Sequence, residues 1–427
     1  MEQLKKKRKV LLLGAGAAMS WGGPSTAKVT DLILGKLVNE NTGHANSRFT
    51  NLIYNFLVYK SNPSKKENEI NFEDIISAVE ELILYYHSPV ENGGKRITPH
   101  FFDVKSDFEN DLEACFSNSK GLYENLLKSL NDILKSIRLF VHKYSRHYSN
   151  ENSKILPCDQ HFDLCRKNER TYLINLFNAW ASNIGLDHSF IRSYTLNYDK
   201  LYKILFENYL LQIGGDSNVQ IFEGFTGKSS DVNQIFFNRD QHCHYNLHGS
   251  TYWHLLNRKG SYELKEYVFE LGQCPYLEMN QDESIVLVEF EVGKPFILSN
   301  IIAGYRKSQR SFNTPFKQMQ ASFEMDCLQA DEIYIIGYSF SDLHINAGLT
   351  SAINENQNLK IHIVDPSFTN DSFKKLVTEI FPELFNEEGF MNGRHKNVGI
   401  PQQYLDEKIN IYPLTFEDYL KHINKII

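Results

Sequence analysis

A short apolar run that ends in a glycine-rich turn is the feature that most constrains the fold of this chain. Residues Val10 to Leu13 form the run, and Gly14-Ala15-Gly16 follows it directly. A helical pattern begins after Pro24 and Ser25, with apolar residues at 29, 32, 33 and 37. A buried strand, a glycine turn and a helix form the opening unit of an open α/β sheet. We therefore expect a parallel sheet to begin here.

The chain returns to this pattern after residue 190. Strand candidates at 191–195, 332–336, 360–364 and 409–412 are joined by helical patterns, and shorter candidates lie at 220–222, 244–247 and 285–290. Between the two parts, apolar residues at helical spacing form stripes over 72–86, 126–144 and 172–180. We predict an α/β fold: a Rossmann-like, doubly wound parallel sheet built from residues 1–40 and 186–427, with residues 41–185 as a large inserted helical lobe.

Composition excludes several classes of protein. The 427 residues suit two or three lobes, and no apolar stretch reaches the ~18 residues of a membrane-spanning helix. The six cysteines include no CxxC pair, which is typical of reduced thiols and not of a zinc knuckle. The apolar stretch after the basic run Lys5 to Lys9 is too short for the core of a signal peptide. We expect a cytoplasmic protein.

The net charge of −7 argues against a nucleic-acid surface that covers the whole chain. The basic run Lys5 to Lys9 resembles a nuclear import signal and could touch nucleic acid. It also lies beside the first strand, where a solvated basic flank is the simpler interpretation. We therefore expect no direct binding of nucleic acid.

Polar side chains follow several predicted strands at the point where each strand ends. Asn197 and Asp199 follow the strand candidate at 191–195, and His248 follows the one at 244–247. Ser339 follows the candidate at 332–336, and Asp365 follows the one at 360–364. Each has a plain alternative: Asn197 and Asp199 cap a helix, and His248 is a structural histidine. Because the carboxyl ends of parallel strands meet at one edge of a sheet, we expect these side chains to form one site.

Two glycine turns at the same edge suit a phosphate. The backbone amides of Gly14-Ala15-Gly16 can approach a pyrophosphate, and the start of the following helix favours its charge. The third glycine of the dinucleotide fingerprint would be residue 19, which is Met19, so a plain tight turn remains an alternative. The loop Gly22 to Thr26, with Pro24 and Ser25, can fold over a ligand. Gly337 repeats the strand-into-glycine design before Ser339.

Two further motifs carry less weight. The segment Gly224 to Ser229 (GFTGKS) lacks the first glycine of a phosphate loop, since Phe222 stands there. His242, His244 and His248 alternate along a predicted strand and would point to one face, but ligands for one zinc ion usually converge from a turn or a helix. We expect no metal site.

The order of the stronger motifs resembles the sirtuin family. The matching residues are Gly14-Ala15-Gly16, Gly23-Pro24, Thr195-x-Asn197-x-Asp199, His248-Gly249 and Gly337-x-Ser339. More closely, the chain resembles the sirtuin-like NADases of bacterial anti-phage defence. That group tends to carry an Asn-Phe-Glu-Asp segment, here Asn71 to Asp74, and a Gly-Tyr-Ser-Phe-x-Asp-x-His-Ile segment, here Gly337 to Ile345.

The resemblance implies NAD as the substrate and a cut at the nicotinamide–ribose bond. His248 would act as general base, Asn197 would hold the water or the ribose, and Asp199 would support it. The residues expected to bind the rest of NAD are Gly14, Ala15, Gly16, Pro24, Ser25, Gly337 and Ser339, with Asp365 on the adenosine ribose. Family members act as toxic effectors, so the resemblance also implies control by homo-oligomerisation or by a partner such as a HerA-type ATPase or a short Argonaute.

Departures from the sirtuin pattern weaken a protein deacylase or ADP-ribosyltransferase interpretation. The zinc module of two CxxC pairs is missing, Leu196 stands at the glutamine position of Thr-Gln-Asn, and Ala18 stands where serine is usual. The Phe-Arg pair after the sirtuin proline is missing as well. A non-catalytic module that senses NAD or ADP-ribose is the third alternative.

Overall fold

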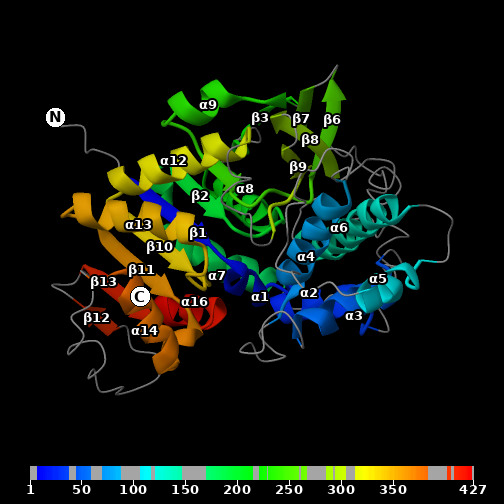
Figure 1. Cartoon of the computed structure of the whole chain (residues 1–427). Coiled ribbons are helices and arrows are strands. Elements are labelled where there is room, and N and C mark those ends of the chain that lie inside the picture. Colours follow the sequence, from blue (N-terminus) through cyan, green and yellow to red (C-terminus); the bar gives the residue numbers. More distant parts are fainter. Residues whose placement is uncertain are drawn as a thin grey trace, which may run out of the picture.

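The computed structural model (Figure 1) shows a central sheet with helices on both faces, a helical lobe beside it and two small antiparallel sheets. It describes residues 7–37, 45–58, 70–87, 106–116, 121–146, 170–214, 221–227, 229–258, 261–266, 285–291, 294–303, 313–382, 402–404 and 408–425. None of the helices in these ranges combines the length and the apolar composition that a bilayer crossing requires.

The central sheet has seven strands in the spatial order β12-β13-β11-β10-β1-β2-β5. Their bounds are β1 Lys9–Leu13, β2 Ile191–Thr195, β5 Cys243–Asn246, β10 Glu332–Ile336, β11 Lys360–Val364, β12 Gln402–Tyr404 and β13 Ile409–Tyr412. All neighbours pair in parallel except β12, which is antiparallel to β13. The chain adds β2 and β5 on one side of β1, and then β10, β11 and β13 on the other. This order confirms the doubly wound α/β fold and puts its switch point between β1 and β10.

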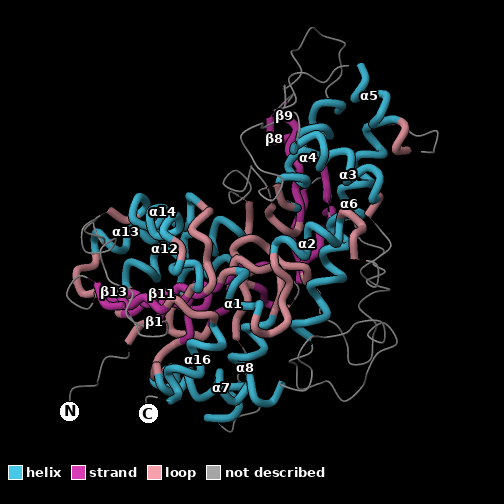
Figure 2. Tube along the Cα trace, turned by 90° about the horizontal axis from the view of Figure 1, so that it is seen from below, coloured by secondary structure: helices cyan, strands magenta, loops and turns pink. Residues whose placement is uncertain are grey.

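Successive side chains of β1 enter two different apolar cores. Val10 and Leu12 pack with the helices of one face, and Leu11 and Leu13 pack with those of the other face. The first face carries α12 (Phe316–Gln329), α13 (Leu343–Glu355) and α14 (Asp371–Ile380), and the second carries α7 (Arg170–Asn183), α8 (Leu201–Gly214) and α16 (Phe416–Lys425). Figure 2 shows these two groups on opposite sides of the sheet. Because β1 is covered on both faces, all four of these positions must be apolar, which explains the unbroken run in the sequence.

The helical lobe packs against the second of these faces. Its helices are α3 (Ser47–Phe56), α4 (Phe72–His87), α5 (Ser106–Glu113) and α6 (Leu122–Arg146), and α2 (Thr26–Ile33), which precedes the predicted start of the lobe at residue 41, packs with them. The stripes predicted over 72–86 and 126–144 correspond to α4 and α6, which pack against each other and against α2. The third stripe corresponds to α7, which packs on α8 and α16 beneath the sheet. The lobe and this face of the sheet therefore share one continuous core.

The region between β2 and β10 is irregular, as the sequence predicts. It contains β3 (Phe225–Thr226), β4 (Ser229–Ser230), α9 (Val232–Phe237), β6 (Trp253–Arg258), β7 (Ser261–Glu266), β8 (Ile285–Glu291) and β9 (Lys294–Ser299). The strands predicted at 244–247 and 285–290 correspond to β5 and β8. Of the strand predicted at 220–222, Phe222 forms a single bridge to Cys243, and Gln220 lies outside the described residues. Of the segment from Gly224 to Ser229, Phe225 and Thr226 form β3 and Ser229 begins β4, and Lys228 lies outside the described residues. These strands pair antiparallel, which is not the strand-to-helix arrangement of a phosphate loop.

Candidate functional site at the carboxyl end of the sheet

The two glycine turns pack against each other at the switch point. The Gly14 N–H donates to Ile336 O (2.9 Å), and the Gly16 N–H donates to Gly337 O (3.0 Å). A β-carbon on Gly14 would lie 2.3 Å from Gly337 O, and one on Gly337 would lie 2.1 Å from Ala17 N. Gly337 also has a φ of +61°, in the left-handed region. These glycines are therefore required for backbone packing, and two of the amides expected to bind pyrophosphate donate within the fold.

A cavity of about 90 Å³ lies beside this contact, between the β1–α1 turn, the β2–α8 turn and the helical lobe. The helix α1 spans Ala15–Met19. The cavity is lined by Ala15, Ala18, Pro24, Thr26, Val29, Phe72, Glu73, Ile137, Val141, Leu196, Asn197, Tyr198 and Asp199. Four of the residues predicted from the sequence thus meet in one place: Ala15, Pro24, Asn197 and Asp199. A site that encloses a whole small ligand usually measures ~300–1,000 Å³, so this cavity suits one ring of a larger ligand.

Hydrogen bonds fix Asn197 at the end of β2. Its Nδ2 donates to Gly14 O (3.1 Å), and its own N–H donates to Thr195 Oγ1 (3.1 Å). The side-chain amide of Asn246, at the end of β5, donates to the carbonyl oxygens of Asn197 and Asp199, both at 2.9 Å. These bonds tie the ends of β1, β2 and β5 together and leave the Asn197 side-chain oxygen as the acceptor that a ligand can use.

Asp199 combines two roles. Its Oδ1 accepts the Leu201 N–H (2.7 Å) at the start of α8, so the helix-capping alternative is confirmed. The residue is only 2% exposed, and it also lines the cavity. The hydrogen bond from the Leu201 N–H holds the Asp199 carboxyl group in place at the start of α8, beside the cavity.

Glu73 is a residue of the cavity to which the sequence assigned no role. It lies in the first turn of α4, where Asn71 Oδ1 accepts the Glu73 N–H (2.8 Å) and Asp74 Oδ2 accepts the Asn71 N–H (2.9 Å). This reciprocal arrangement is a capping box, and it satisfies two backbone N–H groups at the start of α4. The Tyr198 hydroxyl donates to Glu73 Oε1 (3.3 Å). The signal for Glu73 was the Asn-Phe-Glu-Asp segment itself.

His248 lies just past the end of β5 and is 2% exposed. Its Nε2 is 3.7 Å from Oδ1 of Asp342. Asp342 is the N-cap residue of α13, yet its side chain makes no capping bond to that helix and faces His248. A histidine beside a carboxylate is the arrangement of a general base whose protonated form is stabilised. The sequence did not single out Asp342, although it lies in the Gly337 to Ile345 segment.

The three alternating histidines do not share one face of a strand, so that expectation was wrong. β5 begins after His242, whose Nδ1 accepts the Ile191 N–H (3.0 Å), and it ends before His248. Only His244 lies in the strand, with its Nδ1 3.0 Å from Ser193 Oγ, and burial lowers its pKa to about 4. Among the residues that the structure describes, no group of three or more His, Cys, Asp or Glu side chains is placed to hold a metal ion.

His248 does not line the cavity, and neither do three other predicted residues at or near this edge of the sheet. Ser25 Oγ accepts an N–H at the start of α2. Ser339 is exposed, with its Oγ 2.9 Å from Ser341 Oγ. Asp365 is buried at the end of β11, where its Oδ1 accepts the Ser367 N–H (2.7 Å) and burial raises its pKa. Ser25 lies between two residues that line the cavity, whereas a ligand that touches Ser339 and Asp365 must extend out of the cavity and across the ends of β10 and β11.

Comparison with protein-family models and with characterised proteins finds no match. The sirtuin-like resemblance therefore rests on the motifs quoted above and stays a prediction. What the structure adds is the geometry around those motifs.

From the contact between the glycine turns we predict how a substitution there changes the stability of the fold. Gly337→Ala is expected to lower the free energy of unfolding by about 2 kcal/mol or more, because the new β-carbon meets backbone atoms and the φ is unfavourable. Gly214→Ala, at the end of α8, is the matched control, since nothing lies within 4 Å of its added β-carbon. The stability of each of the two variants is measured by urea unfolding and by the yield of folded protein. Equal stability of the two variants would contradict this account of the turn.

Proposed function

We propose that the protein is an NAD glycohydrolase that cleaves NAD to nicotinamide and ADP-ribose. The observation that supports it best is the composition of the cavity. Its walls are mostly apolar, and its polar groups include the carboxylates of Glu73 and Asp199 and the amide of Asn197. The nicotinamide of NAD is a flat ring that carries a positive charge and a carboxamide. Apolar walls suit the ring, carboxylates suit the charge, and the Asn197 amide can pair with the carboxamide.

The place of the cavity supports the same proposal. Ligands of doubly wound sheets bind beyond the carboxyl ends of the strands, at the switch point. The cavity lies at the carboxyl end of the sheet, beside the ends of β1 and β2, and it is lined by the β1–α1 turn that forms one side of the switch point. With the nicotinamide ring in the cavity, the remainder of NAD extends across the ends of β10 and β11, where Ser339 and Asp365 lie.

In the proposed reaction, the bond between the nicotinamide nitrogen and the anomeric carbon breaks, and its electron pair stays on nicotinamide. Nicotinamide leaves neutral and the ribose ring takes up the positive charge, which the carboxylates of Asp199 and Glu73 stabilise. A water oxygen bonds to the anomeric carbon. The proton of that water passes to His248, and the resulting imidazolium is stabilised by Asp342.

The proposal includes the biological setting that the resemblance implies. An unrestrained NAD glycohydrolase would deplete its own cell, so activity must be conditional. The protein would serve as a toxic effector in anti-phage defence, active as a homo-oligomer or with a partner such as a HerA-type ATPase or a short Argonaute.

Two substitutions test the chemistry. His248→Ala is expected to lower nicotinamide release by at least ~10²-fold, the lower range for loss of a general base, and Asn197→Ala should also lower it, because the amide that pairs with the carboxamide is lost. Asp342→Asn should slow release less than His248→Ala does, because it removes only the carboxylate that faces Nε2 of His248 and stabilises the imidazolium formed in the reaction. His188→Ala is the control, since that side chain is 87% exposed. Release of nicotinamide from NAD by the full chain is the measurement, and circular dichroism checks the folding of each variant.

The same assay separates the alternative functions. Release that requires an acetylated peptide would favour a deacylase, and NAD binding without any release would favour a sensing module. Either result would contradict the proposal, as would unchanged release by His248→Ala.

Glu73 has a test of its own. Glu73→Gln keeps the shape of the side chain and removes its charge, so it should lower kcat/KM for NAD by about tenfold, roughly the effect of one charge-assisted contact. Glu81→Gln on the same helix is the matched control, because Glu81 does not line the cavity. Nicotinamide release over a range of NAD concentrations is the readout. Equal values for the two variants would remove Glu73 from the site.

A further inference from the structure

The opposite, amino-terminal edge of the sheet holds a second cavity that the proposed function does not use. It has a volume of about 380 Å³, and its lining is Lys7, Arg8, Val10, Phe190, Arg192, Arg239, Asp240 and Asp326. This volume falls in the range of ~300–1,000 Å³ that is usual for small-ligand sites. Four lining residues are cationic and two are anionic, although the whole chain has a net charge of −7. The cavity therefore concentrates positive charge on an acidic protein.

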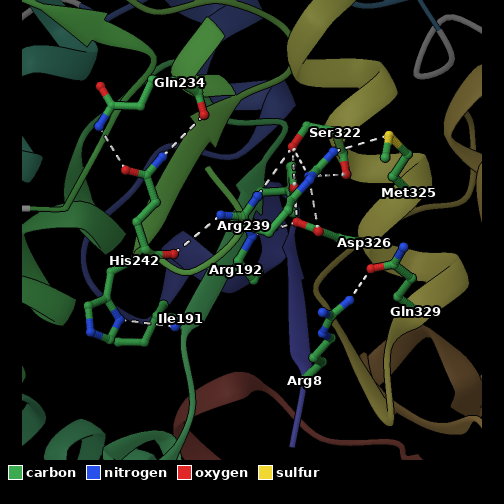
Figure 3. A network of polar contacts seen from close by, with 12 residues as sticks. Arg8, Ile191, Arg192, Gln234, Arg239, His242, Ser322, Met325, Asp326 and Gln329 are labelled. Carbon is green, nitrogen blue, oxygen red and sulfur yellow. Dashed lines mark hydrogen bonds and ion pairs between the residues drawn. The ribbon is translucent and has the colours of Figure 1, made fainter. Parts of the chain in front are cut away.

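Asp326 of α12 forms the buried base of this charge cluster (Figure 3). Its Oδ2 lies 2.6 Å from Nε of Arg192, and its Oδ1 lies 3.1 Å from Nη1 of Arg239. The Tyr194 hydroxyl donates to the same carboxylate, and burial raises the pKa of Tyr194 well above its usual value, so the hydroxyl is neutral. One carboxylate thus faces two guanidinium groups. Arg192 and Asp326 are buried and the Arg239 side chain is 17% exposed, so these three residues together carry one more positive than negative charge on the wall of the cavity.

The two arginines differ in how their donors are used. Arg192 donates to Gln241 O and to Ser322 Oγ, both at 3.3 Å, as well as to Asp326, so its guanidinium ties β2 to α12. Arg239 also reaches Ser322, but its Nη2 points to Met325 Sδ at 3.1 Å. A thioether is a weak acceptor. A phosphate oxygen would be a much better partner for that nitrogen than the sulfur is.

The rim of the cavity adds charge and an apolar face. Lys7 and Arg8 are exposed just before β1. The Lys7 side chain is 67% exposed, and its ammonium group pairs with Glu332 at 3.4 Å. Lys7 can leave this pair for another anion without leaving the Glu332 carboxylate unpaired, because that carboxylate also pairs with Lys9 (3.0 Å). Phe190, just before β2, contributes an aromatic ring to the lining. The planar guanidinium group of arginine presents N–H donors that match the geometry of two phosphate oxygens. An aromatic face such as that of Phe190 can pack against a ring that belongs to the same ligand as the phosphate.

We propose that this cavity binds a small phosphorylated ligand of the nucleotide class. Arg8 and Arg239 hold the phosphate groups, and Phe190 contacts the base. The proposal does not rest on NAD cleavage, because none of these residues lies at the carboxyl end of the sheet. It assigns the protein a second ligand site at the other end of β1 from Gly14.

Isothermal titration of the full chain tests this with inorganic pyrophosphate and with ADP as probes. The wild type should bind both, and Arg239→Gln and Arg8→Gln should each weaken binding of both probes, by about tenfold for Arg239, in keeping with a hydrogen bond to a charged group. Lys375→Gln is the control, an exposed cation on α14, and it should bind like the wild type. Phe190→Ala should reduce the affinity for ADP and leave that for pyrophosphate unchanged. Thermal melting checks that each variant is folded.

Several results would overturn the proposal. One is that the wild type binds neither pyrophosphate nor ADP. Another is an equal loss in Lys375→Gln, which would indicate nonspecific charge attraction. Binding that is lost in Ser339→Ala and kept in Arg8→Gln and Arg239→Gln would place the probe at the carboxyl edge of the sheet. Each result concerns binding alone, so it is distinguishable from a failure of NAD cleavage.

Discussion

The two glycine turns at the switch point meet backbone to backbone, through the hydrogen bonds Gly14 N–H to Ile336 O and Gly16 N–H to Gly337 O. No side chain fits between them, because added β-carbons would come within 3 Å of the facing backbone. This contact sets where β1 and β10 end relative to each other. The same contact positions the Gly14 carbonyl so that Asn197 Nδ2 donates to its oxygen at 3.1 Å. The cavity lies directly beside this contact. The position of the Asn197 side chain in the site therefore depends on this contact.

The helical lobe completes the cavity, which makes the lobe part of the site. Residues of α2, α4 and α6 supply much of the apolar wall, and Glu73 of α4 supplies a carboxylate. The core of the lobe continues into the core beneath the sheet, so the two parts pack as one body on this side. Under the proposed function, a partner that binds the lobe has a direct physical route to the cavity, because α4 begins at its wall.

Much of the fold follows from apolar pattern, because strands covered on both faces leave unbroken apolar runs such as Val10 to Leu13 and packed helices leave stripes such as 72–86. The site was predictable only in part. Residues that follow strands, such as Asn197 and Asp199, could be placed at one edge because topology brings strand ends together. Spacing alone did not reveal where a strand stops, so the three histidines were assigned to one face.

The lobe side of the cavity could not be placed from the sequence at all. Glu73 meets Tyr198 across 125 residues of chain, and no local pattern encodes such a contact. Asp342 was missed for a related reason. An aspartate at a helix start is usually a cap, and only the tertiary structure shows that its carboxylate faces His248.

The central claim is that the nicotinamide ring of NAD occupies the cavity beside the glycine turns. A crystal structure of the His248→Ala variant soaked with NAD tests it most directly, because slow turnover should leave the dinucleotide intact. The account predicts the ring between Ala18 and Val29 with its carboxamide at Asn197, and the pyrophosphate outside, toward Ser339. An ordered NAD molecule with its nicotinamide ring elsewhere, or an empty carboxyl edge at saturating NAD, would contradict it.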